Sequence, residues 1–296
     1  MKTKFVKHGW YPVARGCVAG LVLLIGTFAL AAPLQLPHNP RDLIRRVAAN
    51  ELAADSGVHF MYRDTKQKDN GDSVTKEMID TPDGVLGRVI AINGKPLTPA
   101  QRAKEDKRLN HLLNDPTALA QKRKEQQEDE KRIRTMVGAL PDAFDYQYAG
   151  TQPGPHGEWV LLKFTPNPHY DPPTREQQVY TGMNGDMVVD PVAERLVKID
   201  GTLFREVSFG WGILGRLDKG GRFVVEQSDV GNGHWEPTRM VLHFTGKMLL
   251  FKSLKIQSIE TTSDYRRVPN TLTVAQAMDM LRKADGLAEN SNGGGK

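Results

Sequence analysis

The apolar residues that follow Asn39 recur at the spacing of a helix. Asn39 is a favourable N-cap residue, and Pro40 fits the first helical position because its missing N–H needs no partner there. Leu43 and Val47 then fall on one face. The pattern predicts an amphipathic helix that begins at Pro40 and ends near residues 55–57.

From residue 59 the period falls to two, which predicts β-strands. Eleven strands are predicted, at residues 59–66, 73–81, 85–92, 144–152, 159–165, 178–189, 195–199, 203–209, 222–228, 235–244 and 250–266. Glycine-containing dipeptides are expected to form turns between them, namely Asn93-Gly94, Asn184-Gly185, Asp200-Gly201, Gly220-Gly221, Asn232-Gly233 and Thr245-Gly246.

The segment 99–140 interrupts the strands with a helical pattern. Asp115-Pro116, again a cap followed by proline, divides it into two helices. Residues 121–132 hold five basic, four acidic and no apolar side chains, which favours a solvated helix with i,i+4 ion pairs. A helix that binds a partner is the alternative interpretation. A last helix is predicted at residues 273–284.

Strict alternation within the strands indicates a sheet with one apolar face and one polar face. The apolar positions of two strands illustrate it, namely Val160, Leu162 and Phe164 in one and Met240, Leu242 and Phe244 in the other. Arg239 and His243 fall on the opposite face of the second strand. So many strands with few helices predict an α+β, mainly β fold. We expect one large curved antiparallel sheet, covered by helices, with a helical insertion at residues 99–140.

An apolar run near the N-terminus predicts export. Residues 18–32 are almost entirely apolar, basic residues precede them, and Ala29-Leu30-Ala31 has the small-x-small pattern of a signal peptidase site. A membrane anchor is the alternative, but this run is shorter than the span of about 20 residues that a bilayer needs. We therefore predict a signal peptide at residues 1–31, a single domain at 32–285 and a disordered tail at 286–296. The mature chain is expected in the periplasm or outside the cell, and not as an integral membrane protein.

Cysteine content and charge limit which covalent links and which partners the mature chain is expected to have. The single cysteine, Cys17, lies before the apolar run, so the mature chain is expected to have neither a disulfide nor a lipidated cysteine. The net charge of +5 falls to about +1 without the signal, because residues 1–31 hold four basic and no acidic side chains. So balanced a charge argues against a nucleic-acid partner.

No motif for catalysis, metal binding or a cofactor stands out. The segment Gly210–Gly215 matches G-x-G-x-x-G, but a dinucleotide loop must lead from a strand into a helix, and here another strand follows. A glycine-rich bend is the better explanation. The histidines lack the i,i+4 spacing of a zinc site. A Ser/His/Asp set assembled from distant positions stays open, because such sets are defined by geometry.

Two hairpin-like stretches of the sequence resemble a known protein family. Residues 182–201 read as a strand, an Asp190-Pro191 turn and a second strand, and residues 229–239 read as a glycine-turn hairpin with Trp235 and a Pro-Thr-Arg exit. Together they resemble the outer-membrane lipoprotein-sorting (LolA/LolB-like) superfamily over about half of the chain. The resemblance implies an unclosed half-barrel with an apolar cavity that accepts acyl chains. The charged insertion departs from the pattern of the compact carriers.

Three functions follow as hypotheses. The first is a non-enzymatic binding module for an acyl chain, a lipid or a lipidated protein. The second is an envelope sensor that contacts another protein through the helical insertion, and the third is an exported hydrolase with a dispersed active site. For the first, the candidate residues of the apolar cavity face are Val160, Leu162, Phe164, Met240, Leu242 and Phe244.

Overall fold

The computed structural model of the chain describes residues 36–54, 57–155, 157–210, 214–248 and 252–292, with side chains as far as Ala284. The predicted signal peptide, residues 1–31, lies outside the described residues. None of the helices within the described part is both long and apolar enough to cross a membrane.

Proline-capped helices form where the sequence predicted them. The described helices are α1 (Pro40–Ala53), α2 (Pro99–Asn114), α3 (Pro116–Ala143), α4 (Arg175–Gln178), the 3₁₀ turn η1 (Val179–Gly182) and α5 (Val274–Asn292). The Asn39 side chain accepts a hydrogen bond from the Arg41 N–H at the start of α1. Asp115 does the same for α3, which satisfies N–H groups that have no partner within the helix.

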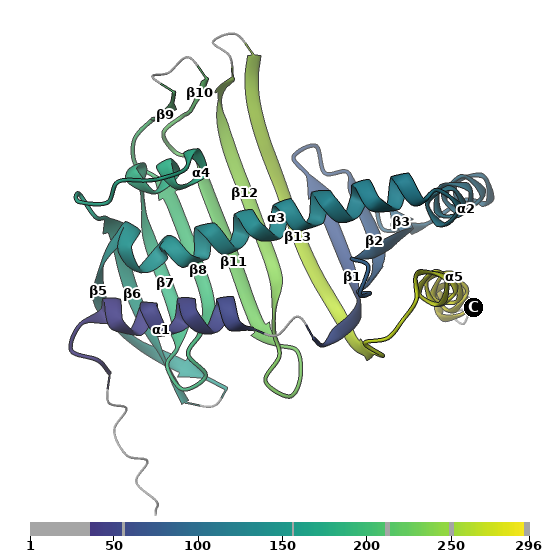
Figure 1. Ribbon diagram of the computed structural model, residues 1–296, viewed down its shortest axis with the longest axis horizontal. Coiled ribbons are helices and arrows are strands. Elements are labelled where there is room, and N and C mark those ends of the chain that lie inside the picture. Colours follow the sequence, from purple (N-terminus) through teal and green to yellow (C-terminus); the bar gives the residue numbers. More distant parts are fainter. Residues whose placement is uncertain (1–35, 55–56, 156, 211–213, 249–251, 293–296) are drawn as a thin grey trace, which may run out of the picture. The chain divides into compact units, whose positions relative to one another are not determined.

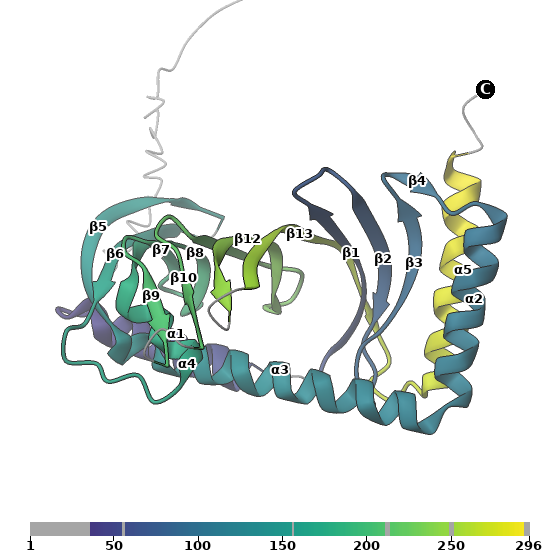
Figure 2. The ribbon, with the colours of Figure 1, turned by 90° about the horizontal axis from the view of Figure 1, so that it is seen from above.

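The strands of the described chain form one antiparallel sheet of thirteen (Figure 1). They are β1 (His59–Lys68), β2 (Ser73–Ile79), β3 (Leu86–Ile92), β4 (Lys95–Pro96), β5 (Phe144–Gly154), β6 (Gly157–Pro166), β7 (Met183–Asp190), β8 (Arg195–Leu203), β9 (Val207–Phe209), β10 (Gly215–Leu217), β11 (Arg222–Asp229), β12 (Trp235–Met248) and β13 (Lys252–Val268). Their order is β4-β3-β2-β1-β13-β12-β11-β8-β7-β6-β5, with β10 paired to β12 and β9. The sheet does not close on itself, and its strands bend (Figure 2). The predicted fold class is confirmed.

Several predicted boundaries are wrong. The predicted strand 178–189 begins only at Met183, because Thr174 caps a short helix there. Two short strands, β4 and β10, were missed, so that thirteen strands replace the predicted eleven. The final helix was predicted to end at Ala284 but continues to Asn292, into the segment predicted to be a disordered tail.

Three of the predicted turns lie inside strands. Gly185 and Gly201 sit opposite each other in β7 and β8, and Gly246 lies within β12. A Cβ atom at Gly201 would lie 2.6 Å from the Phe223 ring and 2.7 Å from the Met183 sulfur. Glycine is therefore needed for side-chain packing across the sheet at this position and not for a reversal of the chain.

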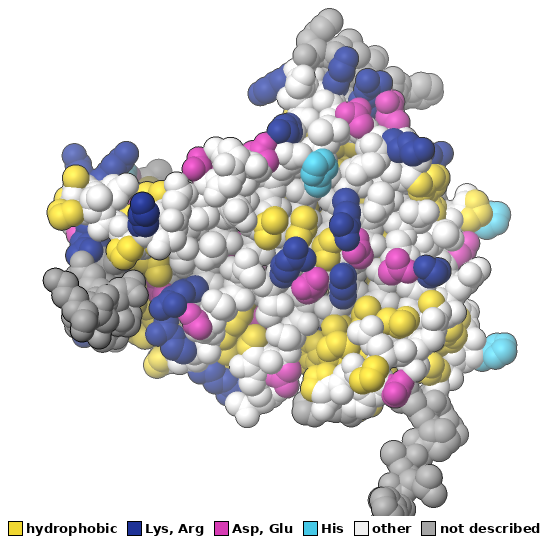
Figure 3. All heavy atoms as spheres, turned by 180° about the vertical axis from the view of Figure 1, so that it is seen from behind, with side chains coloured by type: hydrophobic (Ala, Val, Ile, Leu, Met, Phe, Trp, Pro, Cys, Tyr) yellow, Lys and Arg dark blue, Asp and Glu magenta, His cyan; other side chains and the backbone are white. Residues whose placement is uncertain are grey.

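The face of the sheet away from α1 and α3 carries the charged side chains. Arg222 on β11 forms an ion pair with Asp200 on β8 at 2.6 Å, and Lys163 on β6 pairs with Asp186 on β7 at 2.9 Å. Basic and acidic groups lie interspersed on this face (Figure 3). The prediction of one polar and one apolar face is thus confirmed for these strands.

Two apolar cores hold the helices to the sheet. The first lies under α1 and the C-terminal part of α3 and includes Leu43, Leu140 and Phe164. The second lies under α2 and α5 and includes Leu109 and Met278. Val225, which packs against the first core, lies on the same face of the sheet as Lys66 of β1, because the register joins them through Met240 and Glu260. Met61 of the second core is an odd number of positions from Lys66 along β1, so the two cores occupy opposite faces of the sheet.

The helical insertion is therefore part of the fold. Leu109 on α2 is fully buried in the second core, while Ala139 and Leu140 near the end of α3 are buried in the first. The charged middle of α3 passes between them, and Arg123 pairs with Asp83 of the β2–β3 turn at 2.6 Å. Since Leu119 of α3 packs against the second core and Leu140 lies in the first, this one long helix contacts both cores.

Candidate ligand-binding cavity

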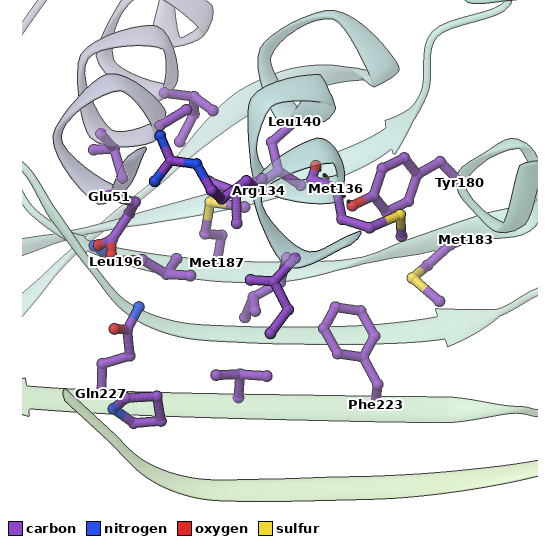
Figure 4. A pocket seen from close by; sticks show the side chains of 18 of the residues that line it. Glu51, Arg134, Met136, Leu140, Tyr180, Met183, Met187, Leu196, Phe223 and Gln227 are labelled. Atoms are coloured by element: carbon purple, nitrogen blue, oxygen red, sulfur yellow. Dashed lines mark hydrogen bonds between the residues drawn. The ribbon is translucent and has the colours of Figure 1, made fainter. Parts of the chain in front are cut away.

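A cavity of about 480 Å³ lies between two helices and the apolar face of the sheet. Its walls come from α1, α3, the turn η1 and strands β7, β8, β11 and β12. In Figure 1, α1 and α3 cross the same face of these strands, and Figure 4 shows the side chains between them. The volume falls within the range of about 300–1,000 Å³ that is usual for small-molecule sites.

The helical wall follows directly from the apolar spacing in the sequence. On α3, Ile133, Met136 and Leu140 point to one side because they are three and four residues apart. Ile44 and Val47 do the same on α1. Ile133 is 62% exposed, so the cavity has a rim at this point of α3 that is open to solvent.

The sheet wall is set by the register of four strands. Met187 on β7 lies beside Ile199 on β8, which lies beside Val225 on β11. Phe223 of β11 pairs with Leu242 of β12 in the same way. All five side chains line the cavity, because residues that face each other across antiparallel strands share one face of a sheet.

Tyr180 lines the cavity, and its ring packs against aromatic rings of the neighbouring core. The centroid of the Phe144 ring lies 4.7 Å from that of Phe164 and 4.9 Å from that of Tyr180. The Tyr180 hydroxyl donates a hydrogen bond to the Met136 carbonyl oxygen at 3.0 Å, which ties η1 to α3. Burial raises the pKa of Tyr180 well above its ordinary value, so its hydroxyl stays protonated and remains a donor.

The six predicted cavity residues divide between the cavity and the core. Leu242 and Phe244 line the cavity. Val160, Leu162 and Phe164 are at most 1% exposed and belong to the filled core beside it. Met240 is half-buried on β12 and does not line the cavity. Ligand contact at these six residues stays a prediction.

No family model matches the sequence, and no curated protein matches it. Among solved structures, the chain is similar to a LolA superfamily protein from Nitrosomonas europaea, with 10% identity and a TM-score of 0.29 over 79% of this chain and 96% of that one. A putative outer membrane lipoprotein-sorting protein domain from Vibrio parahaemolyticus shows 10% identity and a TM-score of 0.30 over 80% and 97%. A DUF1329 family protein from Desulfovibrio piger shows 11% identity and a TM-score of 0.29 over 80% and 96%.

Two of these structures are named for the lipoprotein-sorting superfamily that the sequence resembles.

Sequence reasoning missed most of the residues that line the cavity. Phe223 and Val225 alternate within a strand that was predicted, and Met136 and Leu140 lie in a helix that was also predicted. Each pattern identified an apolar face, but none indicated which faces meet around an empty space. The spacing of apolar residues is the same in a filled core and in a cavity wall.

Few charged groups reach the cavity. Glu51 on α1 pairs with Arg195 on β8 at 3.0 Å, and its other carboxylate oxygen accepts a hydrogen bond from the Leu196 N–H at 3.0 Å. Arg132 on α3 pairs with Asp129 at 2.7 Å. Within the described part of the chain, no group of three or more His, Cys, Asp or Glu is placed to hold a metal ion.

Proposed function

We propose that this chain is a non-enzymatic binding protein whose cavity takes an acyl chain, either of a free lipid or of a lipidated protein. The observation that carries the proposal is the unfilled space of about 480 Å³ between the helices and the sheet, with almost entirely apolar walls. Burial of hydrocarbon contributes about 0.8 kcal/mol per CH₂ group. Ten such groups would supply about 8 kcal/mol before the loss of chain freedom is subtracted.

The lining that we propose for this ligand differs from the one the sequence predicted. Leu242 and Phe244 stay in it, and the residues of β7, β8, β11, α1 and α3 around the cavity join them. Val160, Leu162 and Phe164 are assigned to the core that supports it. The protein is proposed to act after export to the periplasm or beyond the cell, as the apolar run at residues 18–32 predicts.

Contact with another envelope protein through residues 99–140 stays a prediction. The apolar face of α3 near its C-terminus lines this chain's own cavity, and α2 packs against α5 and the sheet. Deletion of the insertion would therefore remove a wall of the cavity together with any partner site. Substitutions within the cavity test the acyl-binding function more cleanly.

The test uses N-phenyl-1-naphthylamine, a neutral dye that fluoresces in apolar sites, and Val225→Phe as the blocking variant. Val225 lines the cavity from the middle of β11, so a phenyl ring there occupies part of the space while suiting a strand. We expect the wild-type protein to bind the dye and Val225→Phe to bind it about tenfold more weakly, which corresponds to about 1.4 kcal/mol.

The matched control is Val241→Phe. Val241 is also half-buried and lies on the neighbouring strand, but it faces away from the cavity because Leu242 faces into it. This variant should bind the dye as the wild type does. Absence of dye binding by the wild type, or equal weakening in both variants, would refute the proposed function.

A further inference from the structure

The cavity has a polar end and an apolar end. Figure 4 shows Glu51, Arg134 and Gln227 toward one end, and Tyr180, Met183 and Phe223 toward the other. A ligand without a polar group would leave the first end without a matching partner. The arrangement suits an amphiphile, a molecule with an apolar tail and a polar head.

The strand register separates the two ends independently of the view. Phe223 lies opposite Gly201 near the end of β8, whereas Gln227 lies beyond Glu226, which pairs with Lys198. Phe223 and Gln227 share one face and are four residues apart, which corresponds to about 13 Å along the strand. Gln227 at the polar end and Phe223 at the aromatic end are thus separated by about half the length of β11.

Arg134 differs from the other charged groups at this end. Glu51 already engages Arg195 and the Leu196 N–H, as described above, and Arg132 engages Asp129. For Arg134, by contrast, no carboxylate of the described chain lies within 4.0 Å, and no described residue forms a hydrogen bond with its guanidinium. Its charge is available to a ligand.

Arg134 also stands where a headgroup would enter. It lines the cavity and a second hollow of about 450 Å³, and Leu52 is shared between the two in the same way. The residue is exposed to solvent on α3, next to the exposed rim at Ile133. A guanidinium at such a boundary can bind an anion while the apolar tail extends inward.

We propose that the cavity selects an amphiphile with an anionic head, a carboxylate or a phosphate, and that Arg134 binds this head. The proposal rests on the proposed acyl-binding function and adds the charge of the ligand to it. A cationic head is disfavoured because the one carboxylate among the described residues that line the cavity, that of Glu51, is held by Arg195. Gln227 has both a donor and an acceptor and fits either sign of charge.

The test compares ligands that share a ten-carbon tail and differ in the head. Decanoate, decyl phosphate, decanol and decyltrimethylammonium are each used at pH 8 to displace N-phenyl-1-naphthylamine from the purified protein. We expect at least one of the two anions to bind about tenfold more tightly than decanol, as one charge-assisted hydrogen bond allows. The anion that binds more tightly identifies the head as carboxylate or phosphate.

Substitution of Arg134 then assigns the preference to this residue. In Arg134→Gln the anion-to-decanol ratio should fall from about ten to about one, and Arg134→Lys should restore part of it. Lys124→Gln removes the same charge from the same helix ten residues away, about 15 Å, and should leave the ratio unchanged.

Each other outcome overturns the proposal in a distinguishable way. Equal binding of decanol and both anions, or tightest binding of decyltrimethylammonium, would refute the anionic head and leave the acyl-binding function intact. A ratio that is unchanged in Arg134→Gln would refute the role of this residue. Failure of every decyl compound to displace the dye would refute the acyl-binding function itself.

Discussion

At the scale of single residues, two carboxyl groups of the sheet, those of Glu236 and Asp64, have strongly raised pKa values. Burial, together with repulsion by Asp80, raises the pKa of Glu236 from its ordinary 4.5 to about 7, although the nearby Arg195 opposes the shift. Burial and repulsion by Glu260 raise the pKa of Asp64 to about 6. In both cases the protein environment favours the protonated form.

These shifts predict how stability depends on pH. Because the pKa of Glu236 is higher in the folded than in the unfolded state, the native state binds more protons between about pH 4.5 and 7, and stability falls as the pH rises through this interval. Glu236→Gln should raise the melting temperature at pH 8 by on the order of 2–4 °C, the effect of about 1 kcal/mol in a domain of this size. At pH 4.5 the gain should disappear. An equal change at both pH values, measured by circular dichroism, would contradict this explanation.

Two leucines that the sequence placed on equivalent apolar faces have different surroundings. Leu162 is 1% exposed in the filled core, whereas Leu242 is half-buried beside the cavity. Leu162→Ala should lower the free energy of unfolding by about 2–5 kcal/mol, because it opens a new void among packed side chains. Leu242→Ala should cost less, since space already lies next to it. Urea unfolding of both variants measures the difference, and equal losses would indicate that the cavity is filled in solution.

At the scale of the elements, α3 connects the two cores and its start depends on one side chain. Asp115 Oδ1 accepts hydrogen bonds from the Thr117 N–H at 2.9 Å and the Ala118 N–H at 3.1 Å. Asp115→Ala should destabilise the protein by about 1 kcal/mol, whereas Asp115→Asn should retain the cap. The comparison is made by urea unfolding, and an Asn variant as unstable as the Ala variant would show that charge, not capping, is what matters.

The same elements show what the sequence can predict. Asn39-Pro40 and Asp115-Pro116 located helix starts correctly, because capping and the fixed φ of proline are local effects. The dipeptide Asp200-Gly201 was predicted to be a turn, yet it lies within a strand where Gly201 makes room for Phe223. Such packing depends on residues far away in the chain. The cavity eluded sequence analysis for the same reason, since its walls come from seven elements.

At the scale of the whole described chain, the sheet stays open and each of its faces has its own helices. The helices α1 and α3 cover the apolar face around the cavity, and α2 and α5 cover the opposite face near β1 to β3. Filled cores lie on both sides, yet the space between α3 and the strands β8, β11 and β12 is left empty. Natural cores are normally packed without voids larger than a water molecule, and an apolar cavity of this size is the observation on which the proposed acyl-binding function rests.

The most direct measurement is a crystal structure of the protein soaked with 1-bromododecane, in which anomalous scattering locates the bromine atom. We expect a bromine peak inside the cavity, among side chains such as Met187, Val225 and Leu242. This peak should be lost in crystals of Val225→Phe. A cavity closed by its own side chains, or bromine bound only elsewhere on the protein, would contradict the proposed acyl-binding function.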